Sequence, residues 1–455
     1  MRRGRRLTCG FATFLAILSL AWPLSLRGQE RQLSVSPSDS GTPAPITLTL
    51  QDALSRAHAN EPQYRAAITQ YGVARQQTIQ ARAGLLPNVN YNAEFLYTQG
   101  NGTPTARFVG ANGVHEYVSQ GNVHQSLSLQ NLADYRLARA QEALAKANSE
   151  ISARGLVVTV TQTYYAVVIS QRKYATAQRA SAEANHFMDI SQKLEHGGEV
   201  AHSDSIKAQI QAQQQQRALQ DAQLEMERSR LNLAVIVFPN FNENFVTVDD
   251  LDSVDPLPSF DEAEAHAGKE NPQLRAALAS MRAATQQVAV AWNGFLPSLG
   301  LDYFYGIDAN RFAVNGFDPA TGRSFRNLGY AATATLQLPV WNWGAGRAKL
   351  KSAHLEQKQA SVELSFAQRK IVADLKSFYA EAQIARTELD SLRQSADLAA
   401  ESLRLTTMRY RAGEATALEV VDAQNTLTLT QNAFADGQLR FRVAMATLHT
   451  LTGQF

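Results

Sequence analysis

The stretch GFLPSLGLDYFYG at residues 294–306 repeats the pattern of GLLPNVNYNAEFLY at residues 84–97. Each stretch opens with Gly, two bulky apolar residues and Pro. Each then alternates apolar with mostly polar residues, as a β-strand with two different faces does. Helix-like spacing precedes both stretches. We therefore interpret Gly84 with Pro87, and Gly294 with Pro297, as two helix-to-strand junctions.

The match extends upstream of both junctions. Residues 61–87 align without a gap on residues 271–297, at a constant shift of 210 residues. The identical positions, numbered in the first segment, are Pro62, Gln63, Arg65, Ala66, Ala67, Ala74, Gln76, Gln77, Ala81, Gly84, Leu86 and Pro87. Solenoid repeats have periods of roughly 20–50 residues. The much longer shift instead predicts a duplicated half-protein, and so two internal structural repeats.

The N-terminus has the features of a targeting segment. Four arginines within residues 2–6 precede the apolar run 11–21, which is too short to span a bilayer as a helix. We expect a signal peptide at residues 1–28 and a flexible leader at 29–48. The single cysteine, Cys9, lies in this segment, and the net charge of +2 gives no reason to expect a nucleic-acid partner.

Two long helices are predicted from proline-free stretches. In residues 346–411 apolar residues recur in steps of four and three, the seam of a left-handed coiled coil. The seam positions are Ile371, Leu375, Phe378, Ala382, Ala385, Leu389, Leu392, Ala396, Ala399 and Leu403. A helix of this length would extend about 100 Å. The corresponding stretch of the first half, about 135–194, has a weaker seam that Gly155 interrupts.

Each half also predicts two strands. They cover about 87–98 and 117–130 in the first half, and about 297–306 and 328–340 in the second, joined by Gly- and Asn-rich loops at 99–116 and 306–327. One interpretation is a soluble sandwich with one wet face. The other is a transmembrane barrel with lipid outside and water inside. Four strands cannot enclose an aqueous channel, so the barrel would need about twelve strands from three chains.

From residue 46 to about 454 the chain resembles the TolC-like outer-membrane efflux proteins. The resemblance rests on the opening LTLQDALSRAHANEPQYRAA at 48–67, the two junctions and the two hairpin turns at 193–213 and 408–427. It implies a mainly α protein with a transmembrane β part. A homotrimer would form a 12-stranded β-barrel, four strands per chain, in the outer membrane and a long antiparallel coiled-coil α-barrel in the periplasm.

The two hairpin turns align with each other. Gly198 and Glu199 match Gly413 and Glu414 at a shift of 215, so the second half carries about five extra residues between junction and turn. Glycine at such a turn ends a helix in the left-handed conformation. Thr416 followed three residues later by Glu is typical of a capping box. The resemblance implies that these turns are periplasmic tips that dock the adaptor.

The resemblance also implies a periplasmic gate. By position, Glu419 and Asp422 match an acidic pair at the constriction, Tyr410 matches a gate tyrosine, and Ser203 and Asp204 match its hydrogen-bonding partners. Threefold symmetry would give a ring of carboxylates that favours cations and raises the pKa of its members. The alternatives are that Glu419 only caps its helix and that Asp422 is a solvated acid. Alanine at 415 replaces the family's gate arginine, so closure would rest on Arg411, on Tyr410 or on packing.

The rest of the chain is divided as follows. The first repeat covers 49–238 and the second 263–455, and between them the proline- and Asp-rich stretch 239–262 is interpreted as an equatorial insert outside the tube. The glutamine run 209–216 is interpreted as a solvated helix face. Residues 344–349 lack the third glycine and the Gly-Lys-Ser/Thr ending of a phosphate-binding loop, so we interpret them as a barrel-to-helix joint. His196 and His202 lack further metal ligands nearby. We expect no enzyme activity, metal or cofactor.

The expected function is a passive exit duct in the outer membrane of a Gram-negative bacterium. Its partners would be two further copies of the chain, outer-membrane lipid, a periplasmic adaptor (membrane fusion) protein and an inner-membrane transporter of the RND, ABC or MFS type. The cargo, small molecules or polypeptides, stays open. The alternative is a periplasmic coiled-coil scaffold with a soluble β cap and no channel.

Overall fold

The computed structural model describes residues 45–97, 115–240, 243–253, 256–318 and 321–453. The chain divides into the units Met1–Pro45 and Ile46–Phe455, and all elements below belong to the second unit. The expected signal peptide, nearly all of the expected leader and most of the loop 99–116 lie outside the described residues. Residues 46–48, expected at the end of the leader, form the strand β1.

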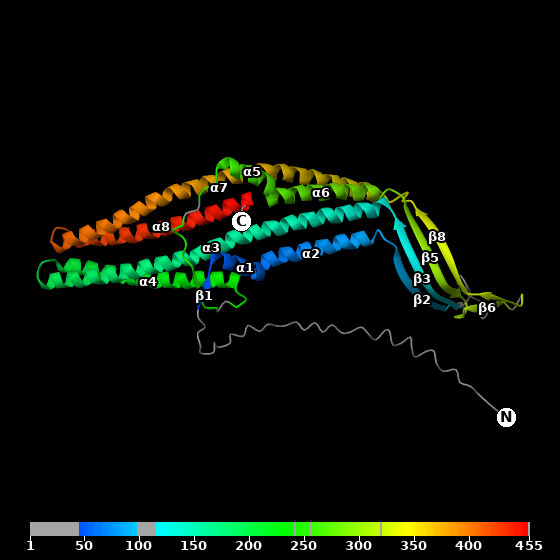
Figure 1. The fold of residues 1–455 in the computed structure, drawn as a ribbon, viewed down its shortest axis with the longest axis horizontal. Helices are drawn as coiled ribbons and strands as arrows, with labels where there is room; N and C mark the ends of the chain where they lie inside the picture. The colour runs from blue at the N-terminus through cyan, green and yellow to red at the C-terminus, as the bar shows by residue number, and fades with distance from the viewer. Residues whose placement is uncertain (1–44, 98–114, 241–242, 254–255, 319–320, 454–455) are drawn as a thin grey trace, which may run out of the picture. The chain divides into compact units, whose positions relative to one another are not determined.

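Eight helices and eight strands make up the described part of this unit (Figure 1). The helices are α1 (Leu50–Asn60), α2 (Pro62–Ala83), α3 (Leu129–His196), α4 (His202–Val237), α5 (Phe260–Glu270), α6 (Pro272–Asn293), α7 (Ala345–Arg411) and α8 (Ala417–Thr452). The strands are β1 (Ile46–Leu48), β2 (Asn88–Tyr97), β3 (His115–Leu127), β4 (Phe245–Thr247), β5 (Ser298–Ala309), β6 (Asn315–Asp318), β7 (Arg323–Arg326) and β8 (Leu328–Gln337).

Corresponding helices of the two halves have nearly equal lengths. Helices α1 and α5 have 11 residues each, α2 and α6 have 22, α3 and α7 have 68 and 67, and α4 and α8 have 36. Because the long helices match, the extra residues of the second half lie before α7. Helix α3 continues through Gly155, so the interrupted seam does not interrupt the helix.

The helices form two antiparallel hairpins, α3–α4 and α7–α8, that pack on each other. Helix α3 contacts α2, α4, α6 and α8, and α7 contacts α6 and α8. The four-stranded sheet lies at one end of these helices and the hairpin tips lie at the other (Figure 1). None of the described helices combines the length and the apolar content needed to cross a membrane.

The main sheet is antiparallel, in the order β2-β3-β5-β8. Its strands agree with the predicted ones, but the predicted loop 306–327 is wrong in part. Strand β5 extends to Ala309, and β6 pairs with β7 in a separate hairpin. The two strands have only four residues each, the shortest run in which alternation can be recognised, so this hairpin was not predicted.

The largest apolar core lies midway along the helices. It brings together residues of α1, α3 and α4 with the two-stranded parallel sheet β1–β4. Strand β4 belongs to the predicted insert 239–262, so this insert is tied into the first half through its pairing with β1. A second cluster lies beside the tips and includes Phe187, Leu403 and Tyr410.

Candidate functional site

The main sheet has two chemically different faces. Register places Tyr91, Gly121, Tyr305 and Tyr330 in one row across the four strands, and all three tyrosines are exposed. Other exposed apolar residues on this face are Val89, Phe95, Tyr97, Val123, Leu127, Leu301, Tyr303 and Leu336. An exposed apolar face of this extent indicates an apolar surrounding or partner.

The opposite face is largely polar. Register places Asn88, His124, Asp302 and Thr333 in one row. The Nδ1 atom of His124 lies 2.7 Å from Oδ1 of Asp302. Side chains of successive residues point to opposite faces of a strand, so the alternation seen in the sequence is realised in space.

The two helix-to-strand junctions have the same geometry. Gly84 ends α2 with φ −63° and Gly294 ends α6 with φ −62°, so neither needs the left-handed region. A Cβ at Gly294 would lie 3.4 Å from the carbonyl oxygen of Ala291, in ordinary contact. Pro87 and Pro297 directly precede the strands. The backbone angles therefore do not require glycine at either position, although the motif stands at the same place in both halves.

The hairpin tips do need glycine. Gly198 and Gly413 have φ +75° and +76°, in the left-handed region. The N–H of Glu199 donates to the carbonyl of Leu194 at 2.9 Å, and the N–H of Glu414 donates to that of Arg409 at 2.8 Å. These bonds satisfy carbonyls that the helix end leaves free. Both glutamates are exposed at the tips.

The capping box predicted at the second tip is confirmed. The backbone N–H of Glu419 donates to Thr416 Oγ1 at 3.4 Å, and that of Thr416 donates to Glu419 Oε1 at 3.1 Å. The backbone hydrogen bond from Thr416 is the largest of the effects that lower the pKa of Glu419 below its ordinary value. Asp422 is exposed one turn further along α8.

Arg409 is the cation that the structure pairs with Glu419, and sequence reasoning missed it. Its Nη1 lies 3.3 Å from Glu419 Oε2. Arg411, one of the residues expected to close the gate, instead places Nη2 3.3 Å from His186 Nε2 on α3. Spacing gave no way to choose between the two arginines, because the turn decides which of them reaches α8.

Tyr410 is buried between the two hairpins, with 2% of its surface exposed. Its hydroxyl lies 3.1 Å from Ser191 Oγ of α3. Its ring packs edge-on against that of Phe187, with the ring centroids 5.0 Å apart. Within one chain the hydroxyl is thus paired with Ser191. Asp204 accepts from Lys207 Nζ at 3.2 Å, and Ser203 is exposed.

The glutamine run 209–216 is not a fully solvated face, which corrects the sequence interpretation. Gln211 and Gln215 are buried against α8, and both donate to Oδ1 of Asn425, at 2.8 and 3.2 Å. Composition suggested solvent because glutamine is usually exposed. Contact between α4 and α8 overrides that preference.

These features coincide with a known family. The family model described as "Outer membrane efflux protein" matches residues 53–237 and 265–454. The chain belongs to the outer membrane efflux protein family. It is therefore an outer-membrane protein of a Gram-negative bacterium and an exit channel for efflux or secretion, and its family is one of transport channels, not of enzymes.

Individual relatives of this efflux protein cover most of the chain. Outer membrane protein TolC of Escherichia coli is 22% identical over 89% of this chain and 82% of its own length. Alkaline protease secretion protein AprF of Pseudomonas aeruginosa is 23% identical over 90% of this chain and 85% of its own. The CmeC channel of Campylobacter jejuni has the same fold, with a TM-score of 0.77 and 17% identity over 89% of this chain and 85% of that one.

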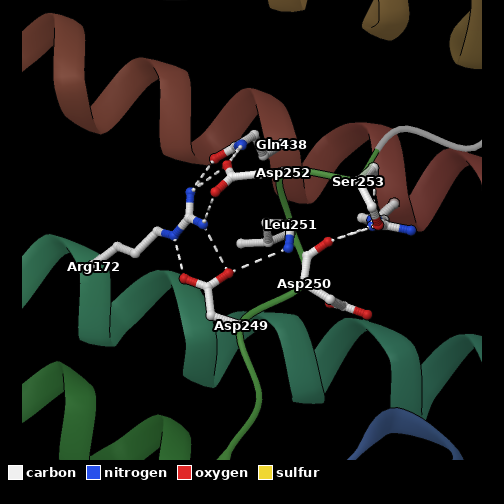
Figure 2. A network of polar contacts seen from close by, with 8 residues as sticks. Arg172, Asp249, Asp250, Leu251, Asp252, Ser253 and Gln438 are labelled. Carbon is white, nitrogen blue, oxygen red and sulfur yellow. Dashed lines mark hydrogen bonds and ion pairs between the residues drawn. The ribbon is translucent and has the colours of Figure 1, made fainter.

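The insert of this efflux protein is held on the helices by a polar network (Figure 2). Arg172 of α3 donates through Nε and Nη2 to both carboxylate oxygens of Asp249, at 2.5 and 2.7 Å. Its Nη1 donates to Gln438 Oε1 of α8 at 2.8 Å. Asp252 accepts hydrogen bonds from both Arg172 and Gln438. Burial lowers the pKa of Arg172, but the two aspartates outweigh it and the net shift is upward.

A tyrosine ties β1 and the residue that follows β4 to α3. The hydroxyl oxygen of Tyr164 lies 3.0 Å from the carbonyl oxygen of Leu48 and 2.8 Å from that of Val248, which share its one proton, and it accepts from the N–H of Val248 at 3.0 Å. Burial raises its pKa to about 12. Among the described residues there is no cluster of three or more His, Cys, Asp or Glu side chains that could hold a metal ion.

Proposed function

We propose that three copies of this chain assemble into one continuous duct, with a twelve-stranded barrel in the outer membrane and a periplasmic tube made of the hairpins. The observation that carries the proposal is the sheet. It has an exposed apolar face, a polar face and two unpaired edges, β2 and β8, of ten residues each.

The edges support assembly because a lipid-exposed sheet edge would leave backbone N–H and C=O groups without partners. Pairing β8 of one copy with β2 of the next removes every edge when the ring closes. The apolar rows would then face the acyl chains and the polar rows the water. The near-equal helix lengths support a duplicated origin, which would give the threefold tube a pseudo-sixfold arrangement of hairpins.

We further propose that the tips are both gate and docking surface. Glu419 and Asp422 of three copies would form an acidic ring, and Tyr410, Ser203 and Asp204 would hold the hairpins in the closed state. The turns at Gly198 with Glu199 and Gly413 with Glu414 would contact a periplasmic adaptor that links the duct to an inner-membrane transporter. The name of the relative AprF supports polypeptides as one possible cargo class.

The test combines location, assembly and conductance. The protein should stay with outer membranes after osmotic shock, sediment in detergent as a trimer and conduct ions across a planar lipid bilayer. Release by osmotic shock, together with a monomeric protein that does not conduct, would instead support the periplasmic scaffold with a soluble β cap.

A further inference from the structure

We propose that residues 338–344, the linker between β8 and α7, form a lipid anchor. Trp341 and Trp343 would lie at the boundary between headgroups and acyl chains in the periplasmic leaflet. Arg347, Lys349 and Lys351 would contact the phosphates of anionic phospholipids there. This inference rests on the proposed barrel, and it places the periplasmic rim of that barrel at the linker.

The linker is specific to the second half. In the first half β3 ends at Leu127 and α3 begins at Leu129, so one residue joins them. In the second half seven residues, LPVWNWG, separate Gln337 from Ala345. This linker is six residues longer than its counterpart and α7 is one residue shorter than α3, which together account for the five extra residues inferred from the two alignment shifts. The insertion thus adds both indoles at one place.

The two indoles are among the most exposed apolar side chains of the described chain. Trp341 is 75% and Trp343 is 89% exposed, and their rings meet edge-on with centroids 5.8 Å apart. Of the four tryptophans in the sequence, a third, Trp292, lies one turn before the neighbouring junction and is also exposed. Indole favours a membrane interface because its ring is apolar while its N–H stays hydrated.

The linker continues the apolar face of the sheet. Leu127, Leu299 and Leu336 form the apolar row nearest to the helices. Leu338 and Val340, just beyond this row, are exposed as well. If the apolar face contacts acyl chains, the tryptophans follow at the depth where acyl chains give way to headgroups.

Contacts with the helix-to-strand junction at residues 294–297 hold the linker in place. Gly346 packs against the ring of Phe295, so closely that a Cβ at 346 would lie 2.8 Å from Phe295 Cε1. Trp343 and Gly344 have φ +54° and +84°, and the N–H of Ala345 donates to the carbonyl of Asn342 at 3.0 Å. A bulky residue rarely adopts a positive φ. The tight turn therefore has a defined shape that projects the indoles from the junction.

Cations follow directly after the indoles. Arg347, Lys349 and Lys351 are exposed in the first two turns of α7. In the part of the chain that the structure describes, none of the three takes part in an ion pair with an acidic side chain. Basic side chains beside a membrane are attracted to anionic lipid. The order of apolar strand end, indoles and cations matches the order of acyl chains, boundary and phosphates.

The test uses tryptophan fluorescence of the full chain in lipid vesicles. In a Trp22→Phe, Trp292→Phe background only the linker indoles emit. We expect phospholipids brominated near the headgroup end of their acyl chains to quench this emission by roughly half or more, and lipids brominated near the terminal methyl to quench it less, because interfacial indoles lie shallow. The matched control, Trp22→Phe, Trp341→Phe, Trp343→Phe, reports Trp292 alone and should be quenched less.

A second measurement addresses the cations. At equal mole fraction, brominated anionic phosphatidylglycerol should quench the linker indoles about twofold more than brominated phosphatidylcholine, because the basic residues enrich anionic lipid around them. Changing Arg347, Lys349 and Lys351 to Gln should remove this difference and leave quenching by phosphatidylcholine unchanged. Equal quenching by both lipids in the unmodified chain would overturn the role of the cations.

Unquenched emission would overturn the anchor in either of two ways. A blue-shifted, unquenched spectrum would mean that a neighbouring copy covers the indoles, and a red-shifted one that they lie in water. Failure of the barrel itself is distinguishable, because the protein would then neither float with the vesicles nor conduct ions. Flotation and conductance with unquenched indoles would leave the duct intact and remove only the anchor.

Discussion

Arg172 of α3 and Asp249 of the insert 239–262 form a two-point ion pair, in which two guanidinium nitrogens meet both carboxylate oxygens. The residues are separated by 77 positions in the sequence. Through Gln438 the same guanidinium also reaches α8, so one side chain joins the insert to both hairpins. The insert therefore does more than connect the two halves of the chain, since it is hydrogen-bonded to helices of both hairpins.

Removing this guanidinium should loosen the insert locally. We expect Arg172→Met to raise the hydrogen-exchange rate of the amides in residues 245–253 by about 10- to 100-fold, because charge-assisted hydrogen bonds contribute about 1.5–3 kcal/mol. Hydrogen exchange followed by mass spectrometry measures this local opening.

The control for Arg172 is Arg440→Met. Arg440 pairs with Glu381 and Glu388 at 2.6 Å, but these three side chains are 43–48% exposed, and exposed pairs contribute little. Arg440→Met should leave the hydrogen-exchange rate of the amides in residues 245–253 unchanged. Equal exchange in Arg172→Met and the unmodified protein would show that the insert is held by β1–β4 pairing alone.

Tyr164 predicts how the contact of α3 with Leu48 and Val248 responds to alkaline pH. Its pKa is raised from 10.0 to about 12 because burial disfavours the phenolate. The neutral phenol is the form that the folded state favours, so this contribution to stability is complete below pH 10 and is lost as the pH rises through 12. Burial also raises the pKa of the neighbouring Tyr165.

Absorbance of tyrosinate during an alkaline titration checks this prediction. A late-ionising fraction should be present in the unmodified protein and should shrink in Tyr164→Phe, which also loses its hydrogen bonds to Leu48 and Val248. A late fraction of the same size in Tyr164→Phe would contradict the assignment.

The tip glycines should tolerate substitution very differently. Gly198→Ala and Gly413→Ala each force a Cβ into the left-handed region, at a cost of about 1–2 kcal/mol. Gly197→Ala should be neutral or slightly stabilising, because Gly197 has φ −75° and alanine loses less entropy on folding. The second half already carries alanine, Ala412, at the position that matches Gly197. Hydrogen exchange in the last turns of α3 and α7 measures the difference, and equal exchange in all three variants would argue against it.

Local patterns were sufficient to predict the long helices, the main strands and the tips. The predicted helix 346–411 differs from α7 by one residue, because a coiled-coil seam and the Gly at the tip define both ends. The glycines at 198 and 413 were predicted from turn chemistry, and their positive φ confirms it. Signals of this kind depend on neighbours within one or two turns.

Contacts between distant segments could not be predicted. Ser191 meets the hydroxyl of Tyr410 across 219 positions, and Asn425 meets Gln211 across 214. Neither pair has a spacing signature, since each depends on how two hairpins pack. The same holds for Arg409, which reaches Glu419 only because the turn folds α8 back on α7.

The proposed acidic ring can be tested without damaging the helix that carries it. Glu419→Ala would also remove the capping box, at about 1 kcal/mol. Glu419→Gln with Asp422→Asn keeps an acceptor at the cap and removes both charges. We expect this double variant to raise the concentration of divalent cation that half-blocks the single-channel current by roughly tenfold or more, because a ring of carboxylates concentrates cations at the pore axis.

Glu414→Gln, at the same tip, is the control and should leave the block unchanged. The pH dependence then distinguishes two electrostatic situations. If the hydrogen bonds from Thr416 and the Arg409 ion pair dominate, the pKa of Glu419 stays below its ordinary 4.5 and block persists as the pH falls to that value. If repulsion between carboxylates of three copies dominates, the carboxylates are protonated at a higher pH, because protonation relieves the repulsion. The block is then already lost above that pH value as the solution is acidified. Unchanged block in the double variant would remove the ring, and closure would then rest on the buried contact between Tyr410 and Ser191.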